Sequence, residues 1–499
     1  MEIFGNLALG FEQALSWSNL SYCFIGVLLG TLIGVLPGLG PVVTIAMLLP
    51  ITFGLPPVSA MIMLAGIYYG AQYGGSTTAV LVNLPGEPGS VVTAIDGYQL
   101  ARKGKAGLAL FTAAVGSFFA GTVATFLIAG FAPPLADAAL AFGPAEYFSL
   151  MMLGLVAAVA LAHGPILKAI AMVVLGLLLG TMGQDIYTGI PRFTFGVQEF
   201  AEGIDFAALA MGIFGIAEVV RNLESSEVRE PIHSRLRDLI PTREELKSIV
   251  MPILRGTGLG SVLGILPGGG AILGSFASYS VEKWFSKNPV PFGKGAIEGV
   301  AGPESANNAG AQTSFIPMLT LGIPSNPVMA LMIGALIIQG IVPGPNVIKE
   351  KPDLFWGVVT SMWIGNVMLL ILNLPLVGFW VRLMTIPYRV LYPAIIVTCC
   401  IGVYSLGYNV FDVSLMAAFG VLGYILIKLN CEPAPLLLGF VIGRLLEEYL
   451  RRAMLLSRGD PVTFFENPIS ASLLSISILL MLIILLPSVR RKREEAFKE

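Results

Sequence analysis

The sequence predicts an all-α polytopic membrane protein with about ten to twelve transmembrane segments. The first observation is composition, since 55% of the 499 residues are hydrophobic and only 12% are charged. Soluble domains carry about 25% charged residues, so this chain lacks the polar side chains that a water-facing surface requires. The second is a series of apolar stretches, each about as long as the 20 residues that cross a bilayer. The third is an internal repeat in which Pro and Gly interrupt such stretches.

The apolar stretches are of two kinds. The uninterrupted ones are predicted spans at 107–131, 146–162, 165–182, 204–220, 355–378, 390–408, 411–428 and 466–488. The others contain Pro and Gly and lie at 17–53, 58–95, 254–280 and 311–343. Non-helical backbone at membrane depth is tolerated only where it lines a cavity or is buried in protein. We therefore expect broken or re-entrant helices in the interior.

Charge divides the chain into parts. We predict a first membrane repeat half at 1–220, a polar cytoplasmic linker at 221–250, a second membrane repeat half at 251–489 and a basic cytoplasmic tail at 490–499. Basic loops favour the cytoplasm, which also places Arg102 and Lys105 inside. No Lys or Arg precedes Arg102, which predicts an outside N-terminus and no cleavable signal peptide, because such a peptide needs a basic n-region. Counting spans back from the tail places Lys351 outside.

The internal repeat consists of two matched pairs of motifs. Residues 34–40 read GVLPGLG, and residues 264–270, which lie 230 positions later, read GILPGGG. In the same order, residues 84–88 read LPGEP and residues 323–327 read IPSNP. Paired segments of this kind are the best sequence pointer to the binding site of a secondary transporter. Span counting gives the copies opposite orientations, so we predict inverted repeats and alternating access.

The interrupted segments are suited to binding a carboxylate. Proline breaks a helix, and the half-helix that follows presents free N–H groups and about half a positive charge. The predicted helix breaks are Pro37, Pro85, Pro267 and Pro324. The predicted substrate-binding residues offer donors near these breaks, and they are Gly38, Gly40, Thr44, Gly75, Ser76, Thr77, Thr78, Gly268, Gly269, Gly270, Asn307, Asn308, Gln312, Thr313, Ser314, Ser325 and Asn326. The alternative interpretation is that these small residues pack helices together.

Charge balance predicts a coupling ion. Two half-helix ends supply roughly one positive charge together, which is less than the charge of a di- or tricarboxylate. We therefore expect Na⁺ or H⁺ to bind with the substrate, with Na⁺ held near the helix breaks by freed carbonyl groups. Glu87 and Glu304 lie closest to the repeat motifs, and a proton or cation role is a further hypothesis for either. No organic cofactor is expected.

Enzyme motifs are absent from the sequence. It contains no G-x-x-x-x-G-K-[ST] phosphate loop and no H-E-x-x-H zinc motif. Only two histidines, His163 and His233, occur, which excludes a multi-histidine metal site. A net charge of −2 gives no reason to expect a nucleic-acid partner. We expect a protein that moves a small solute rather than an enzyme.

Four motifs carry a family resemblance: GVLPGLGP at 34–41, YGAQYGGSTT at 69–78, NLPGEP at 83–88 and GPESANNAG at 302–310. Over nearly its whole length the chain resembles the large membrane subunit of the tripartite tricarboxylate transporter family. The resemblance implies a multi-pass secondary transporter in a bacterial inner membrane. It also implies a small membrane subunit and a periplasmic solute-binding protein as partners, and uptake of carboxylates such as citrate driven by an ion gradient.

The resemblance thus implies the large permease subunit of a binding-protein-dependent importer of di- and tricarboxylates. Two alternatives stay open. One is a standalone secondary transporter for another small organic anion. The other is an intramembrane enzyme, which requires a catalytic dyad at membrane depth.

Overall fold

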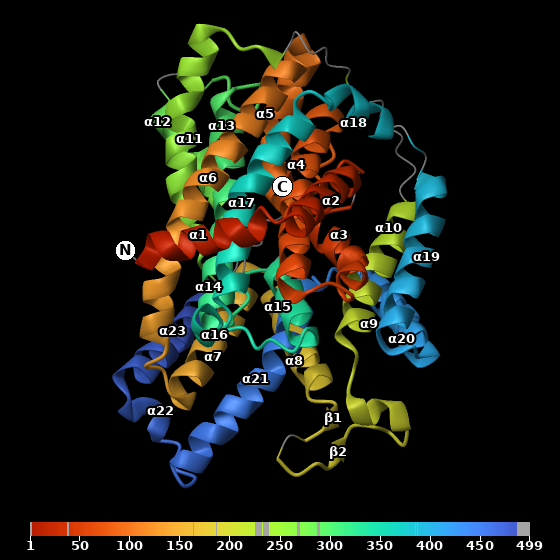
Figure 1. The fold of residues 1–499 in the computed structure, drawn as a ribbon, viewed down its shortest axis with the longest axis vertical. Coiled ribbons are helices and arrows are strands. Elements are labelled where there is room, and N and C mark those ends of the chain that lie inside the picture. The colour runs from red at the N-terminus through yellow and green to blue at the C-terminus, as the bar shows by residue number, and fades with distance from the viewer. Residues whose placement is uncertain are drawn as a thin grey trace.

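The chain is an elongated bundle of helices, as a computed structural model shows (Figure 1). The structure describes residues 2–36, 39–162, 164–185, 187–224, 232, 239–266, 270–286, 290–384, 386 and 388–486. Several predicted features lie outside these residues, namely Pro37, Gly38, Pro267, Gly268, Gly269, residues 225–231 and 233–238 of the polar linker, and the basic tail.

The elements up to residue 224 form a run of helices with one short hairpin. In chain order they are α1 (Glu2–Ala14), α2 (Trp17–Gly34), α3 (Pro41–Leu48), η1 (Leu49–Thr52), α4 (Pro57–Val82), η2 (Pro88–Ser90), α5 (Val91–Leu100), η3 (Ala101–Lys105), α6 (Ala106–Ala139), α7 (Pro144–Leu161), α8 (Ile166–Gly180), β1 (Gly183–Gln184), β2 (Pro191–Arg192), η4 (Gln198–Glu202), α9 (Phe206–Ala210), η5 (Met211–Ile216) and α10 (Ala217–Glu224).

The elements from residue 243 onward are all helical. They are α11 (Arg243–Gly264), α12 (Gly270–Phe285), α13 (Glu298–Thr313), α14 (Phe315–Leu321), α15 (Pro327–Ile338), α16 (Asn346–Glu350), α17 (Pro352–Asn373), α18 (Val377–Met384), α19 (Tyr388–Gly407), α20 (Val410–Lys428), α21 (Ala434–Leu456), α22 (Thr463–Glu466) and α23 (Pro468–Leu485).

Apolar helices of membrane-spanning length confirm the predicted all-α polytopic membrane class. Within the described ranges, six helical segments are long and apolar enough to cross a bilayer: Trp17–Gly34, Pro88–Ala139, Phe206–Glu224, Pro352–Asn373, Val410–Lys428 and Pro468–Leu485. Shorter apolar helices lie at Pro41–Thr52, Pro144–Ala160, Ile166–Gly180, Pro327–Ile338 and Leu391–Gly407. How many of the shorter helices cross stays a prediction, and with it the total of about ten to twelve crossings.

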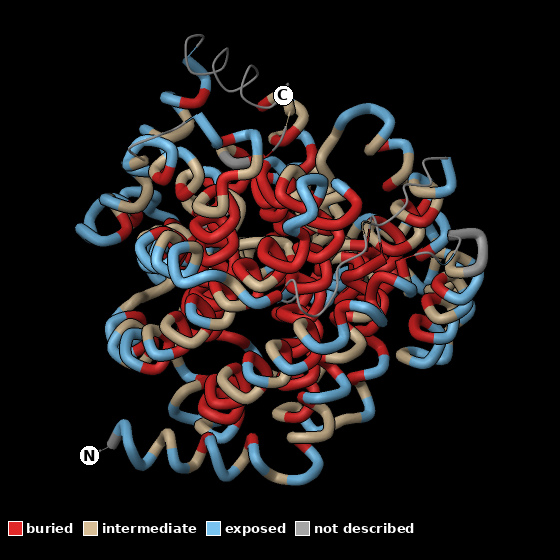
Figure 2. Tube along the Cα trace, turned by 90° about the horizontal axis from the view of Figure 1, so that it is seen from above, coloured by how far each residue is buried: buried red, intermediate tan, exposed pale blue. Residues whose placement is uncertain are grey.

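The distribution of buried residues is that of a protein solvated by lipid. Buried residues fill the centre of the bundle when it is seen from above, and exposed residues lie around its rim (Figure 2). Large apolar side chains such as Phe126, Phe131, Ile371 and Leu479 are exposed on that rim. In water such a surface would be unusual for a monomer, whereas hydrocarbon solvates it. The helices therefore present apolar residues outward and keep polar residues inside.

Two helix pairs, α2 with α4 and α11 with α13, are packed through glycine. A Cβ atom added at Gly30 of α2 would meet the carbonyl oxygen of Ile67 at 2.3 Å. One at Gly260 of α11 would meet the carbonyl oxygen of Ala306 at 2.1 Å. Backbone thus lies directly on backbone, as in tightly packed membrane helices. Each helix pair has three such contacts, evenly spaced along the helix. They are made by Gly26, Gly30 and Gly34 in the first pair and by Gly256, Gly260 and Gly264 in the second.

The internal repeat recurs in backbone conformation. The residue after α4, Asn83, has φ 58°, and the residue 239 positions later, Gly322 after α14, has φ 70°. Glu87 and Asn326, also 239 positions apart, are both extended residues that precede a helix beginning with proline. Left-handed backbone at the end of a helix is a common stop signal. Both copies therefore contain the same arrangement, in which a helix ends, a short turn follows, and a new helix begins at Pro.

Two ion pairs mark the opposite ends of α6. Immediately before this helix, Lys105 Nζ lies 2.8 Å from Glu245 Oε1 in the first turn of α11. Near its other end, Asp137 Oδ1 lies 3.0 Å from Lys349 Nζ in α16. The 34 residues of α6 extend roughly 50 Å, which exceeds the ~30 Å hydrocarbon core of a bilayer. Lys105 and Glu245 therefore lie on one face, and Asp137 and Lys349 on the other.

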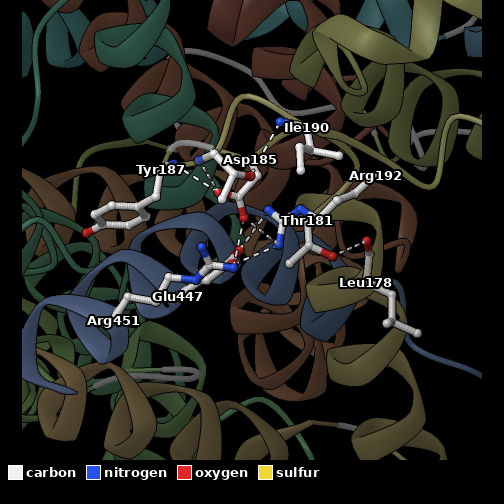
Figure 3. Close-up of polar contacts among 9 residues, drawn as sticks. Leu178, Thr181, Asp185, Tyr187, Ile190, Arg192, Glu447 and Arg451 are labelled. Carbon is white, nitrogen blue, oxygen red and sulfur yellow. Dashed lines mark hydrogen bonds and ion pairs between the residues drawn. The ribbon is translucent and has the colours of Figure 1, made fainter. Parts of the chain in front are cut away.

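A charged network ties the β1–β2 hairpin to α21 (Figure 3). Arg192 donates to both carboxylate oxygens of Glu447, at 2.7 and 3.0 Å. Arg451 contacts Asp185 and Glu447, at 2.8 and 2.7 Å. The backbone N–H of Thr188 and the Arg451 guanidinium lower the pKa of Asp185 well below its usual range. The network holds the hairpin and the end of α21 together outside the apolar bundle.

Candidate functional site

Of the four predicted helix breaks, the structure describes those at Pro85 and Pro324. Pro85 lies in the turn between Val82 and Pro88, and Pro324 lies in the turn between Leu321 and Pro327. We name these the first turn (residues 83–87) and the second turn (residues 322–326). Upstream of each turn, a helix stops where the repeated LPG motif begins, since α2 ends at Gly34 and α11 ends at Gly264. Each copy therefore contains two interrupted segments.

Each turn meets the central helix of the other copy. The side-chain amide of Asn307, on α13, donates a hydrogen bond to Glu87 Oε1 in the first turn. The Tyr68 hydroxyl, on α4, lies close to the side chains of Ser314 and Asn326, the latter in the second turn. Asn307 and Tyr68 are themselves 239 positions apart. The two contacts are thus equivalent under the repeat, and they place both turns at the centre of the protein.

A buried carboxylate lies one helical turn from Asn307. Glu304 is 0% exposed. Its Oε2 accepts hydrogen bonds from Ser76 at 2.9 Å and from Ser117 at 3.3 Å, and its Oε1 accepts one from Thr93 at 2.5 Å. These donors come from α4, α6 and α5, so we call the four residues the Glu304 cluster. It joins three helices of the first copy to α13 of the second.

A small cavity adjoins the Glu304 cluster. Its volume is about 20 Å³, which is room for one water molecule or one small ion. Six of its lining residues carry a side-chain oxygen, and these are Tyr73, Ser76, Thr77, Ser117, Glu304 and Asn373. The hydroxyl of Tyr73 and Oδ1 of Asn373 have no hydrogen-bond partner among the described residues. Buried polar atoms without a partner are uncommon in folded proteins, so these atoms are available to a ligand.

Further unpartnered polar atoms lie between the Glu304 cluster and the turns. Within the part of the chain that the structure describes, the Tyr69 hydroxyl, both polar side-chain atoms of Gln72, and Asn307 Oδ1 have no hydrogen-bond partner. Gly89 leaves space for the Asn307 amide, because a Cβ atom there would lie 2.4 Å from Asn307 Oδ1. Tyr69 and Gln72 belong to α4, and Asn307 belongs to α13, the central helices of the two copies. The interior is therefore polar where the copies meet.

Four of the predicted polar residues contribute directly to this interior. Ser76 and Asn307 bind Glu304 and Glu87 respectively. The amide of Asn308 donates to Ser117 Oγ at 2.6 Å, and Gln312 Oε1 accepts from Thr125 at 3.5 Å. All four lie on α4 or α13. For these residues the structure favours a role beyond simple helix packing.

Other predicted residues use their hydroxyl groups within their own helix. Thr44, Thr77, Thr78, Thr313 and Ser314 each donate to a backbone carbonyl three or four residues earlier. Such bonds satisfy the hydroxyl locally. A substrate contact from these groups would have to replace an existing bond or use the lone pairs that remain.

The predicted glycines described by the structure are sites of close backbone approach. A Cβ atom at Gly40 would meet the carbonyl oxygen of Gly86 at 2.5 Å, and Gly75 also lies against Gly86. Gly270 lies against Leu263 in the second copy, where a Cβ atom would meet the carbonyl oxygen at 2.3 Å. Gly40 and Gly75 thus bring α3 and α4 close to the first turn at Gly86, and Gly270 brings the start of α12 close to the end of α11. Gly38, Gly268 and Gly269 lie outside the described residues.

The second turn holds the last two predicted residues. Ser325 donates to the carbonyl oxygen of Ser314 at 3.5 Å. Asn326 Oδ1 accepts from the N–H of Met329 at 2.9 Å and so caps α15. In the first turn the equivalent position is the acidic Glu87, which precedes η2 and α5. The two helix N-termini therefore differ in charge, and the one at α15, capped by a neutral amide, is better suited to an anion.

Sequence reasoning missed several residues of this region. Thr93, Ser117, Tyr68, Tyr73 and Asn373 were not among the predicted site residues, and all five are buried. Ser117 and Asn373 lie in helices that read as ordinary apolar spans. The one signal in the sequence was Glu304 itself, because a carboxyl group in an apolar helix requires polar partners.

A larger cavity opens on the Lys349 face. It has a volume of about 740 Å³ and shares Val342 and Pro343 with a smaller cavity that Lys351 lines. Its acidic lining residues are Glu199, Glu202, Asp205, Asp412 and Glu448, and its basic residue is Arg444. Negative potential therefore dominates this cavity.

Comparison with known proteins identifies the chain. The family model described as "Tripartite tricarboxylate transporter TctA family" matches residues 20–438. The chain belongs to the TctA family of tripartite tricarboxylate transporters. It is 63% identical to an Agrobacterium vitis protein described as an uncharacterized 52.8 kDa protein in the TAR-I ttuC' 3' region, over 100% of this chain and 99% of that protein.

A second Agrobacterium vitis relative of this TctA-family chain is described as an uncharacterized protein in the TAR-II ttuC' 3' region. It is 65% identical over 48% of this chain and 99% of its own length. No solved structure matches the chain. Membership of the TctA family makes the chain a membrane-embedded transport protein, and the motifs that carried the resemblance at 34–41, 69–78 and 302–310 all lie within the matched region.

Proposed function

We propose that this TctA-family chain is the large permease subunit of a secondary transporter that imports di- and tricarboxylates of the citrate type. It resides in a bacterial inner membrane, and a Na⁺ or H⁺ gradient drives uptake. Its partners are a small membrane subunit and a periplasmic solute-binding protein. The observation that carries the proposal is the pair of crossed contacts, Asn307 with Glu87 and Tyr68 with Asn326, at interrupted helices in the protein interior.

Many alternating-access transporters contain two copies of opposite orientation, and contacts at helix ends support that arrangement. Near the end of α5, Asp96 accepts from the N–H groups of Gly295 and Ala296, just before α13. Just beyond the end of α15, Gln339 lies 3.3 Å from the carbonyl oxygen of Thr52, shortly before α4. Since α5 leads to Lys105 and α15 leads to Lys349, α13 and α4 start from opposite faces. We therefore propose inverted repeats.

The acidic entrance supports a role for a binding protein. A free dicarboxylate is repelled by a cavity lined by five carboxylates and one arginine. A docked binding protein raises the local substrate concentration at this entrance, and a co-bound cation lowers the net charge of the substrate. The proposal places the Lys349 face in the periplasm and the Lys105 face in the cytoplasm, in accord with the basic residues Arg102, Lys103 and Lys105.

The decisive experiment is uptake of radiolabelled citrate and other carboxylates by proteoliposomes that contain this chain and its small membrane subunit. We expect uptake only when the binding protein is present and only with an inward Na⁺ or H⁺ gradient. Equal uptake without the binding protein would instead support the standalone transporter. An absence of uptake for every di- and tricarboxylate tested, with all three components correctly assembled, would reject the proposal.

A further inference from the structure

Among the described carboxylates that are at most 2% exposed, Glu304 differs from Glu282 and Asp96 in what surrounds it. Glu282, 2% exposed, is neutralised by an ion pair with Arg255. Asp96, 0% exposed, accepts from two backbone N–H groups and the Tyr279 hydroxyl. Glu304 has hydroxyl donors alone, and no ion pair of the described residues includes it. A buried carboxylate without a compensating charge is unfavourable.

The space beside Glu304 has the dimensions and the lining of an ion site. The adjoining cavity of about 20 Å³ accommodates one atom-sized occupant. Two of its lining residues, Tyr73 and Asn373, are only 5% and 8% exposed and carry polar atoms without a partner among the described residues. The Asn373 amide nitrogen already donates to the carbonyl oxygen of Leu369 at 2.9 Å. The side-chain atom that remains available to a ligand is therefore Oδ1.

We propose that Glu304 and the oxygen atoms around this cavity form a binding site for a single dehydrated Na⁺ ion. The first ligand is Glu304 Oε2, and the others are the side-chain oxygens of Ser76, Ser117, Tyr73 and Asn373. The ion supplies the positive charge that Glu304 lacks, and it gives the two unpartnered oxygens an electrostatic partner.

Charge and ligand type select this ion. Oxygen ligands suit hard cations, but Ca²⁺ and Mg²⁺ sites in proteins usually include several carboxylates or bound waters. One carboxylate and one atom-sized space are suited to a monovalent cation. A proton on Glu304 would neutralise the carboxylate, but it would leave the oxygens of Tyr73 and Asn373 without a partner.

The site is positioned to couple ion binding to substrate binding, and this part of the inference rests on the proposed function. Thr93 binds Glu304 and belongs to α5, the helix that follows the first turn. Asn307, one helical turn beyond Glu304 on α13, binds Glu87 in that same turn. An ion at Glu304 therefore stabilises the packing of α5 on α13 and fixes the position of the first turn. Release of the ion loosens the same contact.

Ion binding is tested on the purified full-length protein in detergent, without substrate. Binding of radioactive Na⁺ and Na⁺-dependent thermal stabilisation are measured at constant pH and ionic strength, with choline as the replacement cation. We expect the wild-type protein to bind Na⁺ saturably. Glu304→Gln should weaken binding at least about tenfold, and Tyr73→Phe should weaken it by a smaller factor.

The matched control is Ser305→Ala. Ser305 is the neighbour of Glu304 on α13 and is equally buried, but its hydroxyl donates to the carbonyl oxygen of Ala301. This variant should bind Na⁺ like the wild type. If Glu304→Gln fails to fold, Tyr73→Phe and Ser76→Ala serve in its place, because both keep the carboxylate.

Three results would overturn the site: no saturable Na⁺ binding by the wild type, stabilisation by protons alone, or wild-type affinity in folded Glu304→Gln. If Na⁺ binds as expected but no carboxylate is transported, the ion site stands and the transport proposal fails. If carboxylates are transported but Na⁺ does not bind, the reverse holds.

Discussion

The side-chain amide of Asn307 donates a hydrogen bond to the carboxylate of Glu87, although these residues belong to different copies of the internal repeat. The bond fastens the first turn to the central helix of the second copy. Asn307 is 1% exposed, and its Oδ1 has no partner among the described residues. The amide nitrogen of Asn307 thus links the two copies, and its Oδ1 is available to a ligand.

Substitution of Asn307 should abolish uptake. In Asn307→Ala, Glu87 loses its donor and the candidate site loses a buried amide, so we expect transport to fall more than tenfold, as for loss of a hydrogen bond to a charged group. Ser305→Ala is the matched control, because Ser305 is also buried on a central helix but its hydroxyl donates only to the carbonyl oxygen of Ala301 in its own helix. Uptake is measured in proteoliposomes at equal protein content. Normal uptake by Asn307→Ala would remove this residue from the site.

The glycine contacts predict a contrast within α11. Gly260→Ala places a methyl group 2.1 Å from the carbonyl oxygen of Ala306, whereas Gly258 has nothing within 4 Å of its Cβ position. Overpacking typically costs about 1–3 kcal/mol. We therefore expect Gly260→Ala to lower the melting temperature in detergent and Gly258→Ala to leave it unchanged. Equal melting temperatures for the two variants would show that α11 and α13 separate easily.

Orientation can be tested with a pair of lysines. Lys105 and Lys349 are both exposed and lie near opposite ends of α6. In a variant that lacks Cys23, Cys399, Cys400 and Cys431, we expect Lys349→Cys to react with an impermeant maleimide added to intact cells. Lys105→Cys should react only after the membrane is opened. Labelling of both cysteines in intact cells would contradict the proposed topology.

The network around Asp185 predicts a dependence of stability on pH. Because the pKa of Asp185 is lowered in the folded protein, its stabilising contribution is complete above the pKa of the unfolded chain, about 4. The contribution is lost as the pH falls through the lower pKa of the folded protein. We expect Asp185→Asn to melt at a lower temperature than the wild type near pH 6. The difference should shrink as the pH falls below about 4, as measured by thermal unfolding in detergent.

If the difference between Asp185→Asn and the wild type were the same throughout this range of pH, the charge of Asp185 would not be what the network uses. Arg451→Met provides a second measurement. It removes one of the two main causes of the lowered pKa and leaves the N–H of Thr188 in place. Its unfolding should therefore depend less steeply on pH than that of the wild type.

The membrane class and the repeat could be predicted from the sequence because both depend on composition and on local motifs. Pro and Gly constrain the backbone conformation locally, so interruptions of the helices at Pro85 and Pro324 could be predicted from the sequence. The register of the repeat was harder to predict. The first pair of motifs is separated by 230 positions, whereas Asn83 and Gly322, like Glu87 and Asn326, are separated by 239 positions. No single offset in the sequence therefore aligns the whole of the two copies.

The partners of Glu304 could not be predicted, because they depend on which helices become neighbours. Ser76, Thr93 and Ser117 come from three helices that are far from α13 in the sequence. A serine in an apolar span looks the same whether it binds its own helix, as Ser477 does through the carbonyl oxygen of Leu473, or a distant carboxylate. Tertiary packing decides between the two, and a single sequence does not record it.

The glycine contacts also limit how the protein can move. Along α2–α4 and along α11–α13, the two backbones are in direct contact at the glycines. No side chain lies between them there that could change rotamer and let one helix slide past the other. Each pair must travel as one block. We therefore expect relative motion where polar side chains meet instead, as Ser117 of α6 meets Asn308 of α13.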